Sequence, residues 1–178
     1  RPGLDVRVSY LDHVAPGAAT ALEELAARGA GEAVVLPMLL TAAYHSKVDL
    51  PGVLEEARER SPWLRVRYAH TLGPHPLLLD AVERRLEEAG ARPGPDTALV
   101  LASAGSSDPE ANTTVSAMAS ELAARGPWRE VAVAYASAAS PRPGEAVAAL
   151  RERGASRVAV ATYLLAPGFF ADRVRDQS

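Results

Sequence analysis

The sequence predicts an α/β fold with two tandem, repeated flavodoxin- or Rossmann-like lobes, each built on a parallel sheet. Three observations lead to this prediction: short apolar runs alternate with amphipathic segments, most of the runs are apolar on both faces, and the chain repeats itself once. Strands that alternate with helices are typical of βαβ units, whose ligands bind at the carboxyl ends of the strands.

The predicted strands are short apolar or β-branched runs, most of them continuous enough to be buried on both faces. They are residues 6–11, 33–40, 65–70, 98–103, 131–136 and 157–165. Between them lie segments whose leucines, valines and alanines recur every three or four residues, and several of these end in glycine, as helices do. The predicted helices are residues 19–29, 51–60, 75–90, 112–126 and 144–154. Residues 91–96, with two prolines and a glycine, are the predicted linker.

An internal repeat relates the two halves of the chain without a gap, at the offset that carries Val6 to Val131. Residues of the same type recur at this offset. They are Val6, Val8, Tyr10, Pro16, Leu25, Arg28, Gly29, Ala30, Val35, Leu39 and Leu40, which align with Val131, Val133, Tyr135, Pro141, Leu150, Arg153, Gly154, Ala155, Val160, Leu164 and Leu165. The sequence therefore predicts a first lobe over residues 1–95 and a second lobe over residues 96–178.

Each copy contains material that the other lacks. The second copy opens with a predicted strand, turn and helix over residues 96–129 that have no counterpart in the first, and the first continues over residues 50–90, which have none in the second. Two full copies need about 250 residues, more than the 178 present. We therefore expect the tandem to be incomplete at both ends, with the first lobe's opening strand lying before Arg1.

Composition and charge exclude several classes of partner and cofactor. The net charge of −3 and the absence of a basic run argue against nucleic acid as a partner. No apolar stretch is long enough to span a membrane, no signal peptide is evident, and we expect a cytoplasmic protein. Zero cysteines exclude thiolate ligands and cysteine nucleophiles. Neither a GxGxxG nor a Walker lysine is present, so we expect no organic cofactor.

The stretch TAAYHSKVDLP, residues 41–51, places His45 and Lys47 in a loop after an apolar run. A neutral imidazole near pH 7 can accept a proton or bind a metal ion transiently. Judged alone, a solitary loop histidine is more often a surface or capping residue. Asp49 precedes Pro51 closely enough to cap a helix that starts there, and Asp108 before Pro109 repeats the arrangement.

Three further histidines have plain interpretations. His13 aligns with Ala138 in a loop, and solvent exposure is the more natural reading. His70 and His75 flank the sequence LGP, where packing or helix initiation explains them as well as a pocket does.

Together, LPMLLTAAYHSKVDLP in one lobe, LGPHPLL at residues 72–78, and a strand followed by GSSDP and a helix in the other resemble the sirohydrochlorin chelatases. These small class II chelatases insert cobalt or ferrous iron into a tetrapyrrole. The resemblance implies that His45 acts at the metal as base and ligand, paired with a histidine of a His-Gly-Ser-Arg-type motif. Alanine stands at that histidine's position in the second copy, Ala104, and Phe170 aligns with His45.

The resemblance further implies a divalent metal substrate, Fe²⁺ or Co²⁺, and a sirohydrochlorin-type tetrapyrrole rich in carboxylates. Lys47, Ser106 and Ser107 are the expected contacts for those carboxylates. Two other interpretations stay open: a non-catalytic tetrapyrrole- or metal-binding protein, and a two-lobed binder of another small molecule. A homodimer is also left open.

Overall fold

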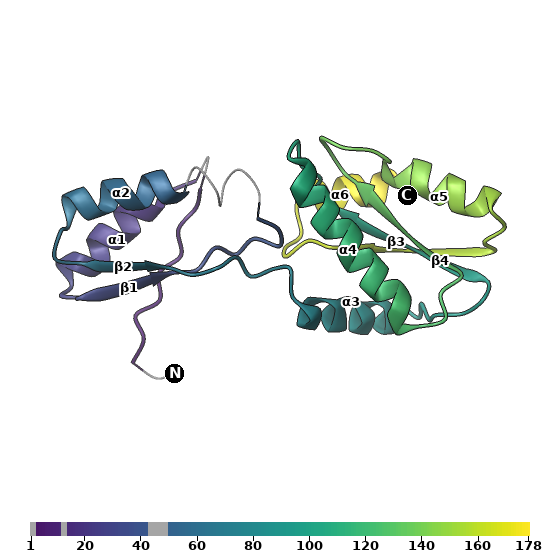
Figure 1. Ribbon diagram of the computed structural model, residues 1–178, viewed down its shortest axis with the longest axis horizontal. Helices are drawn as coiled ribbons and strands as arrows, with labels where there is room; N and C mark the ends of the chain where they lie inside the picture. The colour runs from purple at the N-terminus through teal and green to yellow at the C-terminus, as the bar shows by residue number, and fades with distance from the viewer. Residues whose placement is uncertain (1–2, 12–13, 43–49) are drawn as a thin grey trace. The chain divides into compact units, whose positions relative to one another are not determined.

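The computed structural model describes residues 3–11, 14–42 and 50–178. The chain forms two compact units, Arg1–Leu72 and Gly73–Ser178, each of which carries helices packed on a parallel sheet (Figure 1). This arrangement confirms the predicted α/β class with two parallel sheets.

The described residues of the first unit form two strands and two helices. They are α1 (Ala18–Ala27), β1 (Glu32–Val35), α2 (Leu50–Arg60) and β2 (Arg65–Tyr68). Strand β1 pairs with β2 in parallel, from Glu32 opposite Arg65 to Val35 opposite Tyr68. The core of this unit joins apolar residues of both helices and both strands: Leu22, Ala26, Ala33, Leu54, Ala57, Leu64 and Val66.

The second unit is larger. Its elements are α3 (Pro76–Glu88), β3 (Thr97–Ser103), α4 (Pro109–Arg125), β4 (Glu130–Tyr135), α5 (Pro143–Glu152), β5 (Arg157–Thr162) and α6 (Phe169–Asp176). The strand order is β4-β3-β5, and both pairings are parallel. One core cluster joins β3 to α5 and α6 through alternate strand residues, and Figure 1 shows α4 lying along the sheet.

Strand β3 is the centre of the second unit. All seven of its residues are buried, and Ala98 to Ala102 have no exposed surface at all. A strand that has neighbours on both edges and helices on both faces must be apolar at every position, which the sequence TALVLAS satisfies except at its two ends. This strand fixes the register of both of its neighbours.

The prediction of a strand over residues 6–11 is wrong. The backbone there forms no ladder, only a single parallel bridge between Tyr10 and Gly17, and Val6 and Val8 are 77% and 66% exposed. A strand needs a neighbour that satisfies its backbone groups, and the described residues of the first unit supply none. Strand β1 ends at Val35, so the predicted strand over residues 33–40 is too long. Helix α6 is not among the predicted helices.

The two compact units do not divide the chain where the repeat does. Helix α3 and the predicted linker 91–96 both belong to the second unit, in which Gly94 forms a bridge with Thr97. The units reflect packing, whereas the boundary between residues 95 and 96 comes from sequence similarity. That boundary therefore stays a prediction about the repeat.

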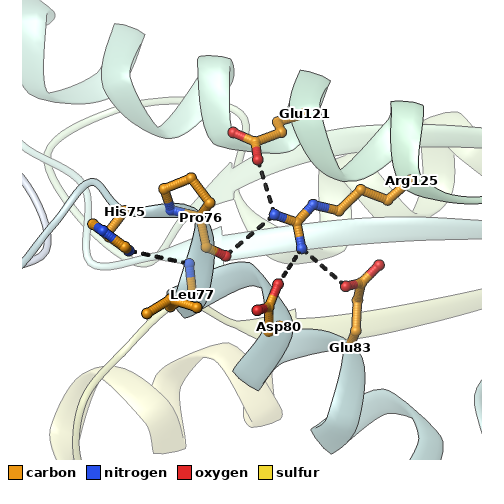
Figure 2. A network of polar contacts seen from close by, with 7 residues as sticks. All are labelled: His75, Pro76, Leu77, Asp80, Glu83, Glu121 and Arg125. Carbon is orange, nitrogen blue, oxygen red and sulfur yellow. Dashed lines mark hydrogen bonds and ion pairs between the residues drawn. The ribbon is translucent and has the colours of Figure 1, made fainter.

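Arg125 at the end of α4 ties α3 to the rest of the second unit (Figure 2). Its guanidinium donates to Asp80 Oδ1 at 2.5 Å, to Glu83 Oε2 at 3.1 Å and to Glu121 Oε1 at 2.9 Å. It also donates to the carbonyl oxygen of Pro76 at 3.2 Å. These partners raise the pKa of Arg125, and the hydrogen bond with Asp80 is the largest of the effects.

This network predicts measurable coupling between α3 and α4. In a double-mutant cycle of Arg125→Met and Asp80→Asn, we expect a coupling free energy of unfolding of about 0.5–1 kcal/mol at low salt, because the arginine is part of a network rather than of an isolated pair. Urea unfolding of the four chains measures it. The pair Arg85 and Glu88, within α3 and more exposed, is the matched control and should couple less. Equal coupling in both cycles would contradict a fastening role for Arg125.

Candidate functional site

The carboxyl edge of the second sheet carries a tight loop, residues 104–108, between β3 and α4. Gly105 in this loop has φ of +84°, and a Cβ atom there would lie 2.0 Å from the carbonyl oxygen of Ser137. Only glycine combines that backbone conformation with so close an approach. Ser137, in the loop after β4, holds that loop against residues 104–108, because its amide and hydroxyl both donate to the carbonyl oxygen of Ala104.

Asn112 holds the loop from the first turns of α4. Its Oδ1 accepts from the Ser106 amide at 3.0 Å, and its Nδ2 donates to the Ser106 carbonyl oxygen at 2.7 Å. The Ser106 hydroxyl accepts from the Asp108 amide at 3.0 Å. Ser106 is half-buried, and its amide, carbonyl oxygen and hydroxyl each take part in a hydrogen bond. Ser107 is exposed.

Two polar residues act as helix caps, as their sequence positions suggested. Asp108 is the N-cap of α4 and accepts from the Glu110 amide at 2.9 Å, with Pro109 as the first helical residue. His75 is the N-cap of α3, and its Nδ1 accepts from the Leu77 amide at 3.2 Å (Figure 2). Both observations confirm the structural role that was weighed for these residues.

Two buried hydroxyl groups lie where β3 and β5 end. Ala102 is the register partner of Thr162, so Ser103 and Tyr163 follow as neighbours on adjacent strands and on the same face of the sheet. Tyr163 is 4% exposed, and burial raises its pKa to about 12. Neither hydroxyl has a hydrogen-bond partner among the described residues. The carboxyl edge of this apolar sheet thus carries two buried hydroxyl groups, those of Ser103 and Tyr163.

The chain that follows β5 presents aromatic side chains. Phe169 and Phe170, at the start of α6, are 69% and 39% exposed and pack edge to face with ring centroids 5.4 Å apart. The positions that correspond to the two histidines of the resemblance are Ala104 and Phe170, and they follow the carboxyl ends of neighbouring strands, β3 and β5. Within the second unit, the topology therefore brings these two positions to one edge of one sheet.

The central predicted residues lie outside the described part of the chain. His45, Lys47 and Asp49 fall within residues 43–49, and His13 within 12–13, so their predicted roles stay predictions. His70 follows β2 and is exposed. In the ranges that the structure describes, no three histidine or carboxylate side chains gather into a group that could hold a metal ion.

Sequence reasoning missed several residues of this edge. Asn112 was read only as the first residue of a helix, and its two bonds to the Ser106 backbone depend on how the loop folds back. The sequence places Ser103 at the end of the predicted strand 98–103 and Tyr163 inside the predicted strand 157–165, with no sign of a polar pair. The side chain of Arg125, which joins two helices, carried no local signal. In the described residues, no helix is both long and apolar enough to cross a membrane.

Comparison with curated proteins gives relatives of one kind. The chain is 28% identical to a sirohydrochlorin cobaltochelatase of Priestia megaterium over 174 residues, which are 96% of this chain and 57% of that protein. It is also 28% identical to sirohydrochlorin ferrochelatases of Priestia megaterium and Bacillus subtilis, over 99% and 94% of this chain and 68% and 64% of theirs. The chain thus spans between about half and two thirds of the length of these relatives.

Solved structures agree with the sequence comparison. SirB from Bacillus subtilis with Fe³⁺ matches with a TM-score of 0.83 at 28% identity, over 96% of this chain and 68% of that one. The sirohydrochlorin chelatase SirB from Bacillus subtilis subspecies spizizenii, in complex with cobalt, matches with a TM-score of 0.76 at 25% identity, over 95% and 64%. The CbiX family model matches residues 1–89 and 98–177, almost the whole of both repeat copies, and this chain therefore belongs to the CbiX family.

Proposed function

We propose that this chain belongs to a sirohydrochlorin chelatase that inserts ferrous iron or cobalt into a tetrapyrrole, with release of two protons. The observation that supports this most is the match of the CbiX family model to both copies of the repeat, together with relatives named for both metals. Relatives of equal identity act on different metals, so the choice between iron and cobalt is not part of the proposal.

The chemistry needs a proton acceptor that does not retain the metal. Two pyrrole N–H protons leave as a divalent cation arrives, and a neutral imidazole can accept a proton or bind the cation briefly. Nitrogen ligands suit iron and cobalt, and one or two imidazoles leave positions open for transfer to the macrocycle. In the proposal, His45 is this base and transient ligand.

The second unit is proposed to bind the macrocycle rather than the metal. Ala104 and Phe170 cannot ligate a cation, but Phe169 and Phe170 expose apolar rings at the carboxyl edge of the sheet. A planar tetrapyrrole can pack a face on such rings. The metal chemistry would then depend on the first unit and on His45.

The proposed carboxylate contacts differ in their electrostatics. Lys47 would attract the carboxylates of the substrate directly. Ser106 and Ser107 lie beside Asp108 and Glu110, whose negative charges oppose those of the substrate at the start of α4. The partial positive charge at the amino end of α4 offsets part of this repulsion, and the two serines would contribute hydrogen bonds from their hydroxyl groups.

The substitutions at Ala104 and Phe170 favour one second candidate, a non-catalytic tetrapyrrole-binding protein. Such a protein would use the same edge of the sheet and bind sirohydrochlorin without inserting metal. Metal insertion by the chain, followed in the absorbance spectrum of sirohydrochlorin with Co²⁺ or Fe²⁺, separates the two candidates.

Replacement of His45 tests the catalytic role. His45→Ala should slow metal insertion by about 100- to 10,000-fold, which is the usual contribution of a general base, while sirohydrochlorin affinity changes little. His13→Ala is the matched control, a second histidine outside the motif, and should leave the rate unchanged. Equal rates in the parent and in His45→Ala would remove His45 from the mechanism.

Reversal of the charge at Lys47 tests the contact with carboxylates. Lys47→Glu should weaken sirohydrochlorin binding by about tenfold at low ionic strength and by less at high salt, because exposed charges are screened. Fluorescence titration at two salt concentrations measures the change. Arg84→Glu, on an exposed position of α3, makes the same change of charge elsewhere and should have a smaller effect. An equal effect of both variants would show that only net charge matters.

Release of the loop 104–108 tests the role of Ser106 and Ser107. Asn112→Ala removes both bonds to the Ser106 backbone, so exchange of the Ser106 amide hydrogen should accelerate by about tenfold or more. If the two serines contact the substrate, sirohydrochlorin affinity should fall in the same variant. A loosened loop with unchanged affinity would exclude both serines from the pocket.

A further inference from the structure

Helix α6 carries an arginine that lies against an exposed aromatic ring. The guanidinium carbon of Arg173 is 5.9 Å from the centroid of the Phe169 ring, within the range of a cation–π attraction. Arg173 and Phe169 are four residues apart in the helix, so they share one side of it. Phe170 packs against Phe169 edge to face. This part of α6 therefore combines two aromatic rings with one cation.

The helix that carries these side chains is fixed to the second unit. Val174 is 2% exposed and belongs to the core cluster that joins α6 to α5 and β3. Gly168, the N-cap, has φ of +140°, a backbone conformation that other residues rarely adopt, and the helix begins directly after it at Phe169. The rings and the guanidinium are thus presented by a helix whose own position is set by the core.

The two arginines of α6 differ in their partners. Arg175 pairs with Asp172 at 3.1 Å, so its charge is already neutralised within the helix. In the part of the chain that the structure describes, no carboxylate pairs with Arg173. Asp176 is the last residue of the helix, at the end away from the rings. An anionic group of a ligand can therefore become the partner of Arg173.

The other two helices that begin at this edge of the second sheet carry different charges. Asp108 and Glu110 place negative charge at the start of α4. Arg142 is the N-cap of α5, and its Nη1 is buried. Among the three helices, α6 is therefore the one that presents a cation beside exposed aromatic rings.

Comparison of the two repeat copies separates the ring from the cation. At the repeat offset, Phe169 aligns with Tyr44, so an aromatic residue stands at this position in both copies. Arg173 aligns with Val48, so the charge at this position occurs only in the second copy. The arginine is therefore a feature of the second copy and not of the repeat.

We propose that Arg173 is a specificity-determining residue, which binds a carboxylate on the rim of the tetrapyrrole while the face of the macrocycle lies on Phe169 and Phe170. This inference rests on the proposed function, since it concerns the same substrate. Guanidinium N–H groups bind carboxylates through charge-assisted hydrogen bonds. The contact with the Phe169 ring restricts the arginine side chain before the substrate arrives, which lowers the entropic cost of binding. Arg173 thereby favours a carboxylated macrocycle over a neutral one.

Substitution of Arg173 in the chain of residues 1–178 tests the proposal by fluorescence titration with sirohydrochlorin. Arg173→Met removes the charge but keeps a long side chain against Phe169, and it should raise the dissociation constant by about tenfold at low ionic strength. Arg175→Met is the matched control, because it removes the same charge from the same helix where Asp172 already neutralises it, and it should change the dissociation constant by less than about twofold. Arg173→Lys keeps a cation and should lie between the two.

Two further readouts separate an electrostatic contact from a structural role of Arg173. The loss of affinity in Arg173→Met should shrink at high salt, because exposed charges are screened. Sirohydrochlorin with all of its carboxylates esterified keeps the macrocycle and loses the charges, so the parent and Arg173→Met should bind it equally well. A loss that is the same at both salt concentrations, or that extends to the ester, would show that Arg173 only supports the rings and would overturn the proposal.

The outcomes also distinguish this inference from the proposed function. Sirohydrochlorin binding that is unchanged in Arg173→Met, or weakened equally in Arg175→Met, would overturn the role of Arg173 and leave the chelatase proposal standing. A selective loss in Arg173→Met, in a chain that inserts neither Fe²⁺ nor Co²⁺, would support the role of Arg173 and overturn the chelatase proposal. A parent chain that does not bind sirohydrochlorin would overturn both.

Discussion

The pairing of β3 with two parallel neighbours is the constraint on which the second unit depends. A buried strand must satisfy its backbone groups on both edges and bury its side chains on both faces, and β3 does so at every position. Its register with β4 and β5 determines where these two strands end along the sheet. The loops that follow these strands are therefore held at one edge, and that edge carries Gly105, Ser106, Tyr163 and Phe170.

The first unit shows what happens to a similar segment that lacks a pairing neighbour among the described residues. Residues 5–11 share Val6, Val8 and Tyr10 with β4 at the repeat offset and have the corresponding contacts to the adjacent helix and loop, yet they form no ladder. Apolar periodicity and end contacts are thus insufficient for a strand. The missing requirement is a neighbour whose backbone donors and acceptors are free to pair.

The second unit has also changed the chemistry that its edge can perform. Ala104, in the loop after β3, and Phe170, in the first turn of α6 after β5, occupy the positions of the two histidines that the chelatase resemblance implies. The topology brings these two positions to one edge of the sheet, and the side chains that stand there are apolar. In the proposed function, this apolar edge of the second unit binds the macrocycle and not the metal.

The sequence by itself determined the α/β class, the repeat, most of the helices and strands, and the cap at Asp108, because these depend on local patterns and on comparison of the two copies. It also pointed to the family. Only the tertiary structure decided that residues 6–11 form no strand, that Asn112 holds the Ser106 backbone, that Arg125 fastens α3 to α4, and that Ser103 and Tyr163 meet at one edge. Each of these depends on which segments become neighbours in space, and a local sequence pattern does not contain that information.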